Sequence, residues 1–293
     1  MPTTTRSAGG IAFQIANHAF LAIAAALCLF PVLHIVAVSF SGAGPAAANA
    51  VVLWPVEFTV SSYASLFSRA PFLDAFGVSA VRVAIGVALN TALTLLMGYP
   101  LSKTRREFPG RNLYMWLLVF VMLFNAGLVP NYLLIKSLGL IDSMWALVLP
   151  SAVPIFNVIL VMNFMKMLPR EIEEAAFMDG ASYWVCWRTL ILPLSKPVIA
   201  TIVLFSFVMH WNAWYDGLIY MNDNGKYPLQ TYLYTVIQDR DVATIEQAND
   251  SATVNGVTLK AAQIFLAMIP ILFLYPFLQK YFTKGIVLGA VKG

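Results

Sequence analysis

A short polar segment interrupts the apolar sequence in its second half. It consists of Glu173, Glu174, Ala175, Ala176, Phe177, Met178, Asp179 and Gly180, and it is followed after an interval by Leu192 and Pro193. Acidic residues in a first helical turn interact favourably with the helix dipole, and Gly180 suits a left-handed helix end. Pro169 suits a helix start, because its missing N–H would be unpaired there. We therefore predict a short exposed helix from Pro169 to Asp179.

This helix has the chemistry of a docking element. Ala175 and Ala176 leave a low surface that a partner can approach closely, while Ile172 and Phe177 offer apolar contacts. A second short helix is predicted around Trp184 to Trp187. An amphipathic helix that only lies on a membrane surface would have a similar composition, and the residues alone leave both readings open.

A second group of residues could bind a carbohydrate. Aromatic faces suit stacking against sugar rings, and an amide hydrogen-bonds hydroxyl groups. The residues are Trp211, Asn212, Trp214 and Tyr215. Aromatic residues near the end of a membrane span also form interfacial belts, so the pattern fits either role.

Three further polar residues lie within apolar stretches: Arg82, Asn125 and Asn157. A guanidinium is costly in hydrocarbon, so Arg82 should face a partner or an aqueous cavity, or extend to the interface. These three residues are secondary candidates for a substrate path, and Arg82 gains interest if the substrate is a uronate.

The composition sets the class of protein that must position these residues. Hydrophobic residues make up 60% of the chain and charged residues 11%, and the mean hydropathy is +0.76. Soluble domains carry roughly 25% charged residues, so the chain belongs in a bilayer. Cys28 and Cys186 lack the spacing of a disulfide framework or a metal site. The sequence has no GxxxxGK[ST], HExxH or GxSxG motif, which indicates that it is not an enzyme and holds no cofactor of its own.

We predict an all-α membrane protein with one domain, 1–293, and six transmembrane helices. The spans expected from apolar length are 19–40, 73–99, 113–132, 144–165, 197–220 and 261–279. The N-terminal apolar run is longer than a signal peptide needs, so we expect it to be retained as a span.

Basic residues predict the orientation of the spans. Twelve lie at the termini and in loops 100–112 and 166–196, against five in the loops of the other side. By the positive-inside rule, both termini and loop 166–196 are cytoplasmic, and loops 41–72 and 221–258 are extracytoplasmic.

The polar segment resembles the EAA loop of ABC importer permeases. Glu174-Ala175-Ala176 is followed by three residues and Gly180, then by nine residues and Leu190-Ile191-Leu192-Pro193. The spacing is the same throughout, and the one departure is Leu190 where isoleucine is usual. The ending Thr283–Gly293 and the pair Trp211-Asn212 resemble the carbohydrate-uptake, maltose-type branch of this family, as does Trp54-Pro55 with the following Tyr63. These resemblances cover most of the chain.

The resemblance implies a type I ABC importer permease in the bacterial inner membrane. Its implied partners are a second homologous permease, two cytoplasmic ATPase subunits that bind ATP and Mg, an extracytoplasmic solute-binding protein, an oligosaccharide substrate and membrane lipid, with no nucleic acid. The EAA helix would couple to the ATPase and the tail would reach its interface. Loop 222–259 would contact the binding protein. Alginate or another uronate is the specific substrate that the resemblance suggests, although no motif specifies it.

Two other functions fit a membrane protein with several spans. An ion-coupled secondary sugar transporter usually carries acidic residues deep in the bilayer, whereas Asp74 and Asp216 lie near the ends of their spans. A membrane scaffold would show no substrate-dependent ATP turnover with a partner ATPase.

Overall fold

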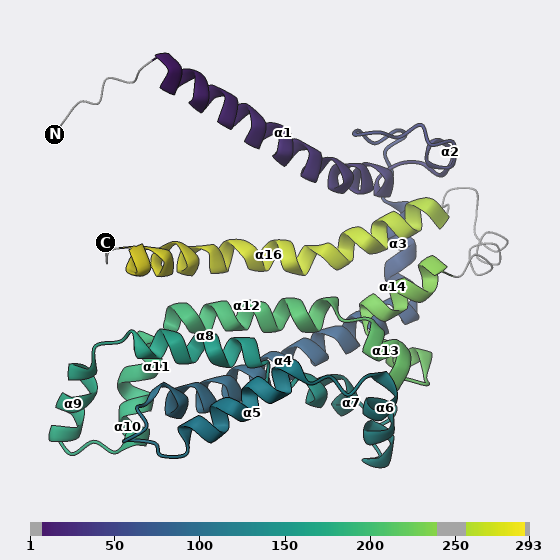
Figure 1. Cartoon of the computed structure of the whole chain (residues 1–293). Helices are drawn as coiled ribbons and strands as arrows, with labels where there is room; N and C mark the ends of the chain where they lie inside the picture. Colours follow the sequence, from purple (N-terminus) through teal and green to yellow (C-terminus); the bar gives the residue numbers. More distant parts are fainter. Residues whose placement is uncertain (1–7, 239–255, 291–293) are drawn as a thin grey trace. The chain divides into compact units, whose positions relative to one another are not determined.

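The computed structural model describes residues 8–238 and 256–290, and these residues form helices and turns with no β-strand (Figure 1). A chain that crosses lipid must pair its backbone polar groups internally, which a helix does within one segment. Residues 291–293 of the predicted ATPase-contacting tail and residues 239–255 of the predicted binding-protein loop lie outside the described part. The prediction of an all-α membrane fold is confirmed.

The first of two compact units comprises residues 1–69 and 235–268. Its helices are α1 (Ala8–Ser39), α2 (Ala43–Ala47), α3 (Ser61–Phe67) and the first part of α16 (Gly256–Ala290). Ser62 donates a hydrogen bond to Thr258 at 3.0 Å, and the Phe40 ring lies 4.8 Å from the Tyr63 ring. These contacts join the aromatic segment that follows α1 to α16 within this unit.

The second unit comprises residues 70–234 and 269–293, and it holds both groups of candidate residues. Its helices and turns are α4 (Ala70–Ser102), α5 (Arg111–Leu123), α6 (Leu128–Ser137), α7 (Met144–Val148), η1 (Leu149–Ser151), α8 (Ile155–Lys166), α9 (Arg170–Met178), α10 (Tyr183–Cys186), η2 (Trp187–Ile191), α11 (Leu192–Leu194), α12 (Lys196–Asn212), α13 (Tyr215–Tyr220), η3 (Asn224–Lys226), most of α14 (Leu229–Gln238) and the rest of α16.

Three of the described helices are long and apolar enough to cross a membrane: Ala12–Ser39, Ala70–Ser102 and Gly256–Leu274. Three further pairs of helices meet that test together but bend sharply where they join. The bends are 115° between α5 and α6, 46° between Met144–Ser151 and α8, and 79° between Tyr183–Leu194 and α12. The predicted spans 113–132 and 144–165 fall on the first two pairs, whereas the predicted span 197–220 covers α12 and α13 and leaves out Tyr183–Leu194. These three spans stay predictions.

The middle spans are less regular than apolar length suggests, and each break has a local cause. The chain leaves α5 in an extended conformation at Phe124 and enters α6 through Gly127, whose φ is +84°. Pro150 and Pro154 lack the N–H that continues a helix, and they lie where η1 gives way to α8. Helix α12 ends at Asn212, and Ala213 is extended.

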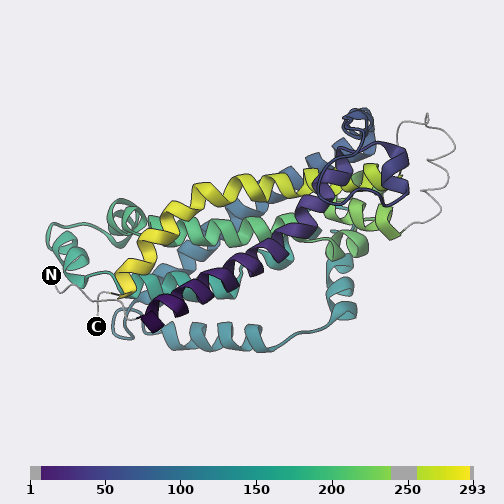
Figure 2. The same cartoon turned by 90° about the horizontal axis from the view of Figure 1, so that it is seen from above.

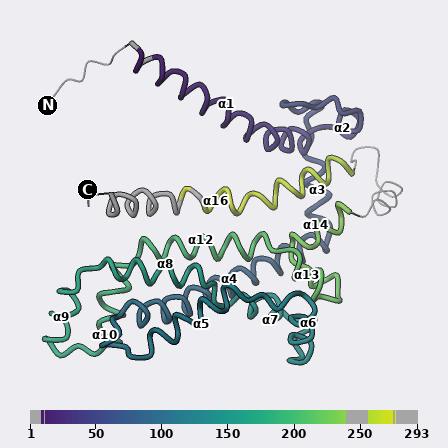
Figure 3. Tube along the Cα trace, in the orientation of Figure 1, coloured from purple at the N-terminus to yellow at the C-terminus, as the bar shows by residue number. Residues whose placement is uncertain are grey.

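Helix α4 is the centre of the second unit, since it packs against both α8 and α12 (Figures 1 and 2). Gly98 allows the close approach of α8, because a Cβ there would lie 2.6 Å from a Val161 methyl group. Figure 3 shows the same path as a Cα tube, with α9 and α10 at one end of this bundle and α13 at the other. The two groups of candidate residues therefore lie at opposite ends of one packed bundle.

Candidate functional site

The predicted docking helix is α9, which begins after Pro169 and ends at Met178. Gly180 has a φ of +81°, its N–H donates to the Phe177 carbonyl at 3.0 Å, and the Ala181 N–H donates to the Ala176 carbonyl at 2.9 Å. This pair of bonds is the Schellman ending that a left-handed glycine permits. Both ends of the predicted helix are thus confirmed to within one residue.

Helix α9 has an inner and an outer face. Ala176 and Phe177 are partly buried and pack on an apolar cluster that joins α4, α8 and α12. Phe177 also contacts Tyr183 of α10, with ring centroids 4.8 Å apart. Glu174, Ala175 and Met178 are exposed, Met178 to 88%. Phe177, which we expected to offer a partner an apolar contact, thus packs within its own chain, and the small Ala175 stands on the free face.

An ion pair joins α9 to the end of α4. The Lys103 ammonium pairs with the Glu173 carboxylate, and the two side chains are only 9% and 18% exposed. The same ammonium lies 4.2 Å from the centre of the Tyr99 ring, a cation–π geometry. The Leu192-Pro193 end of the motif forms α11, which follows the five-residue η2 segment.

Two hollows flank Lys103. One, of about 140 Å³, has charged walls that include Lys166, Arg170 and Glu173, and the other, of about 390 Å³, is lined mainly by aromatic and apolar side chains such as Tyr99, Trp184 and Trp187. Glu107 borders both hollows. Hydrogen bonds from the Thr104 hydroxyl and backbone N–H stabilise its carboxylate and lower its pKa.

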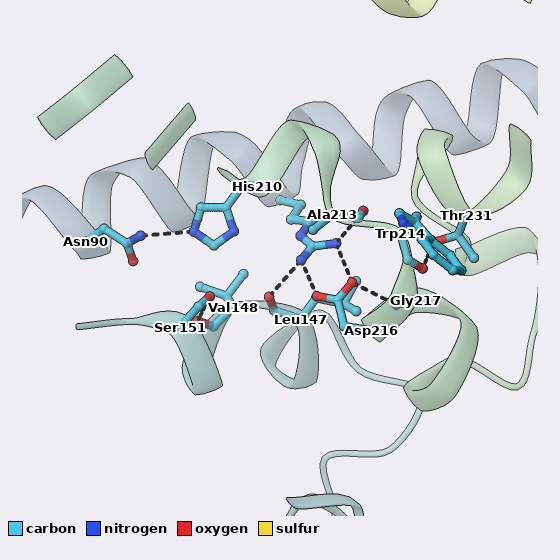
Figure 4. Close-up of polar contacts among 11 residues, drawn as sticks. Asn90, Leu147, Val148, Ser151, His210, Ala213, Trp214, Asp216, Gly217 and Thr231 are labelled. Carbon is cyan, nitrogen blue, oxygen red and sulfur yellow. Dashed lines mark hydrogen bonds and ion pairs between the residues drawn. The ribbon is translucent and has the colours of Figure 1, made fainter. Parts of the chain in front are cut away.

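Arg82 lies at the other end of the bundle and is 1% exposed. Its guanidinium forms a two-armed ion pair with Asp216 of α13, one arm measuring 3.1 Å (Figure 4). It also donates to the carbonyls of Ala213 and Leu147, each at 3.3 Å. We expected Arg82 to face a partner, an aqueous cavity or the membrane interface. The structure shows the first of these, a protein partner.

The aromatic residues beside Asp216 divide into buried and exposed ones. Trp211 is 3% exposed and stacks on Phe207, with centroids 5.9 Å apart. Trp214 and Tyr215 are exposed to 37% and 51%, and Asn212 is also exposed. The Trp214 carbonyl accepts a hydrogen bond from Thr231 at 2.7 Å, and its ring stacks on Tyr234 at 4.2 Å. The turn between α12 and α13 therefore leaves Asn212, Trp214 and Tyr215 exposed, and their role in substrate binding stays a prediction.

The two asparagines lie apart from this turn. The Asn125 side chain accepts a hydrogen bond from the Gly127 N–H at 2.9 Å, a local turn that helps to separate α5 from α6. Asn157 is 3% exposed and faces Ser206 of α12 at 3.4 Å. Neither is brought next to Trp214 by a contact in the described residues.

The structure adds a polar contact that the sequence did not single out. His210 of α12 is buried, and its Nε2 lies 3.2 Å from the Asn90 side-chain amide of α4 (Figure 4). The ring occupies the space beside Gly86, where a Cβ would overlap it. Asp216 was also missed as a site residue. Its charge could have identified it, because Asp216 and Arg82 carry opposite charges and each lies in an apolar stretch.

The sequence matches a family of known membrane proteins. Residues 90–287 match the family model described as the binding-protein-dependent transport system inner membrane component. The chain belongs to this family. The match covers more than half of the chain and includes α9 and the turn at Trp214.

Similar proteins extend the likeness to nearly the full length. Protein LplC of Bacillus subtilis (strain 168) is 43% identical, over 99% of this chain and 98% of LplC. The polygalacturonan/rhamnogalacturonan transport system permease protein YtcP of the same organism is 38% identical, over 96% of this chain and 98% of YtcP.

A crystal structure of a bacterial ABC transporter involved in the import of the acidic polysaccharide alginate contains a chain of the same fold. The TM-score is 0.87 at 30% identity, and the match covers 96% of this chain and 100% of that one. The chain is thus a multi-pass bacterial inner-membrane permease of the type I ABC importer fold. It is a transport component and not an enzyme, and membership of this family implies a partner permease, an ATPase and a binding protein.

Proposed function

We propose that this permease imports an oligosaccharide that carries uronic acids, such as a fragment of alginate or of a galacturonan. The observation that carries the proposal is its full-length similarity to two importers of acidic polysaccharides, one a permease named for polygalacturonan and rhamnogalacturonan and one a transporter of alginate. Both substrates are built largely from sugars that bear a carboxylate. The chain forms half of the translocation path, and a second, homologous permease forms the other half.

The substrate contacts proposed for this half are the exposed groups at the turn between α12 and α13. Trp214 and Tyr215 offer faces to sugar rings, and the Asn212 amide offers hydrogen bonds to hydroxyl groups. Arg82 would be the natural partner for a uronate, but Asp216 already neutralises it and it is buried. We therefore assign the sugar to the aromatic turn and assign Arg82 to support of that turn.

The energy source proposed is ATP with Mg, bound by two cytoplasmic ATPase subunits. The outer face of α9, with Glu174, Ala175 and Met178, docks in the ATPase, and closure of the ATPase dimer displaces α9. What supports this role is the complete EAA spacing together with the observed division of α9 into a packed face and a free face.

The test is reconstitution of the permease with its partner permease, its ATPase and its binding protein in liposomes. A binding protein loaded with oligouronate should stimulate ATP hydrolysis and uptake, and a neutral oligosaccharide of the same length should not. The substrate class is wrong if only the neutral sugar is taken up. Uptake that an ion gradient drives without the ATPase would contradict the whole proposal and favour a secondary transporter.

A further inference from the structure

Helix α4 is fixed at two points that lie far apart along its length. Lys103, just beyond its last residue, pairs with Glu173 of α9, and Arg82 pairs with Asp216 of α13. A helix rises about 1.5 Å per residue, so the two pairs are separated by roughly 30 Å along the axis. This one helix therefore contacts both the proposed ATPase-docking helix and the proposed substrate turn.

The Lys103–Glu173 pair is largely shielded from water, which strengthens its hold between α9 and the end of α4. Its side chains are 9% and 18% exposed, so water screens the pair less than it screens surface charges. Lys103 also lies against Tyr99, within α4 itself. If Glu173 lost its charge, a largely buried ammonium would lose its paired carboxylate and keep the ring of Tyr99 and the charge of the nearby Glu107.

The apolar contacts of α9 lie on the same side as this ion pair. Ala176 and Phe177 pack on the cluster that contains Leu95 and Tyr99 of α4. Glu173 and these two residues lie three and four positions apart, the spacing that places side chains on one face of a helix. The inner face of α9 is thus held on α4, while the outer face is free for a partner.

The N-terminal half of α4 is held at the proposed substrate turn by the second ion pair. Arg82 reaches the carboxylate of Asp216 and the carbonyl of Ala213 (Figure 4). In the sequence these two residues follow and precede Trp214 and Tyr215. Gly86, one turn further along α4, accepts the His210 ring of α12 in close contact. Movement of α4 along its axis would therefore move this turn.

We propose that the Lys103–Glu173 pair is the latch through which α9 drives α4, and that α4 carries this movement to the turn at Trp214. Lys103 acts as a positioning residue: it touches neither substrate nor nucleotide. The alternative route runs through the covalent links from α9 to α8 and α10, and it needs no latch. This inference rests on the proposed function.

The first experiment measures uptake per ATP hydrolysed in the reconstituted complex. Glu173→Gln and Lys103→Met should each lower this ratio about fivefold or more, the scale of a modest coupling free energy. Asp74→Asn is the control, because it also removes a carboxylate charge, at an exposed position of α4 outside the docking helix and the aromatic turn. It should leave the ratio unchanged. Co-purification of the ATPase shows that each variant assembles.

The double exchange Lys103→Glu with Glu173→Lys separates a latch from a direct contact with the ATPase. A latch is restored by the reversed charges, so the ratio should recover at least half of its loss. A Glu173 that worked by touching the ATPase would not be replaced by lysine, and the exchange would stay defective. That result would overturn the proposal.

The second experiment reports on the far end of α4. A cysteine is placed at the exposed Leu218 of α13 in a Cys28→Ser, Cys186→Ala background. Its reaction with a thiol reagent should change when ATP and vanadate are added, and Glu173→Gln should abolish that change. If Glu173→Gln leaves the ATP-dependent change in thiol labelling undiminished, the proposal is wrong. If the permease with native Lys103 and Glu173 shows no ATP-dependent uptake, the proposed function itself has failed.

Discussion

Arg82 shows how a single charge can be accommodated in an apolar bundle. Each of its two terminal nitrogens donates to the Asp216 carboxylate and to one backbone carbonyl, that of Ala213 or of Leu147, so the charge is neutralised and both nitrogens are hydrogen-bonded. Burial of an ion pair need not stabilise a protein, since desolvation offsets the attraction. Removal of one partner is different, because it leaves a buried charge alone.

The pair can be tested by comparing single and double variants. Asp216→Ala should lower the free energy of unfolding by about 3 kcal/mol, since it strands Arg82, whereas Arg82→Met with Asp216→Leu should cost less. Thermal denaturation in detergent micelles measures both. If the double variant proves as unstable as the single one, the stranded charge is not the cause of the loss.

Gly86 and Gly77 lie on the same helix and provide a matched pair. A Cβ at Gly86 would overlap the His210 ring, whereas a Cβ at Gly77 would meet no atom within 4 Å in the part of the chain that the structure describes. Gly86→Ala should therefore destabilise the protein by about 1–3 kcal/mol through overpacking. Gly77→Ala should be neutral or stabilising by up to about 1 kcal/mol, because alanine favours a helix. Equal melting temperatures for the two variants would contradict the close packing of α4 on α12.

Helix α9 owes its length to its ending as much as to its composition. The left-handed conformation of Gly180 allows two backbone hydrogen bonds that close the helix, and no atom of the described residues lies within 4 Å of a Cβ placed there. The cost of a side chain at this position is therefore one of backbone conformation and not of crowding.

Two substitutions at Gly180 should behave differently. Gly180→Val forces a β-branched residue into a left-handed conformation, at a cost of about 1–2 kcal/mol, whereas asparagine tolerates it. In the reconstituted complex, Gly180→Val should hydrolyse ATP without matching uptake, and Gly180→Asn should keep most of the coupling. Unchanged uptake in Gly180→Val would count against the coupling role of α9.

The connection between α6 and α7 is tied to the segment after α13 by an ion pair that is more exposed than the two ion pairs of α4. Asp142 accepts from Lys226 at 2.5 Å and from the Asn222 N–H at 3.1 Å. The Lys226 hydrogen bond lowers the Asp142 pKa below its ordinary 3.8, and Asp142 raises the Lys226 pKa above 10.5.

The sign of both shifts predicts how the tie depends on pH. A lowered carboxyl pKa gives stability that is present above about pH 4 and lost as the pH falls through the folded value, and a raised lysine pKa gives stability that is lost above about pH 10.5. The Asn222 and Asp223 amide protons should therefore exchange more slowly between these limits, after correction for intrinsic rates. Asp142→Asn should remove the acceleration of exchange at acid pH. If that acceleration persists in this variant, a group other than Asp142 causes it.

At the scale of the whole molecule, the orientation in the membrane is still a prediction from the basic residues. It places Met178 in the cytoplasm and Trp54 outside, and both side chains are well exposed, at 88% and 81%. A cysteine at either position, in a Cys28→Ser background, is therefore open to a reagent that cannot cross the membrane.

The labelling pattern in intact spheroplasts tests this orientation. Trp54→Cys should be labelled from outside, and Met178→Cys should be labelled only in inverted vesicles. Labelling of Met178→Cys in intact spheroplasts would reverse the orientation and remove α9 from contact with any cytoplasmic ATPase.

The sequence by itself determined the helical class, the membrane setting and the length of α9. Each of these follows from local information: apolar runs long enough to cross lipid, and a proline, acidic residues and a glycine at fixed spacing. The breaks after Leu123 and Asn212 were harder to predict from the same local information. Apolar length shows that a segment can cross lipid, but it does not show where the helix within that segment ends.

Only the tertiary structure decided which polar groups meet. Arg82 and Asp216 are 134 positions apart, and Lys103 and Glu173 are 70 apart. Hydrocarbon forces buried charges to find partners, but it does not specify the pairs. The packing of α4 against α8 and α12 does, because it brings the ends of these helices together. This packing also places Trp211 inside the bundle and leaves Trp214 and Tyr215 exposed, a division that their shared aromatic chemistry could not predict.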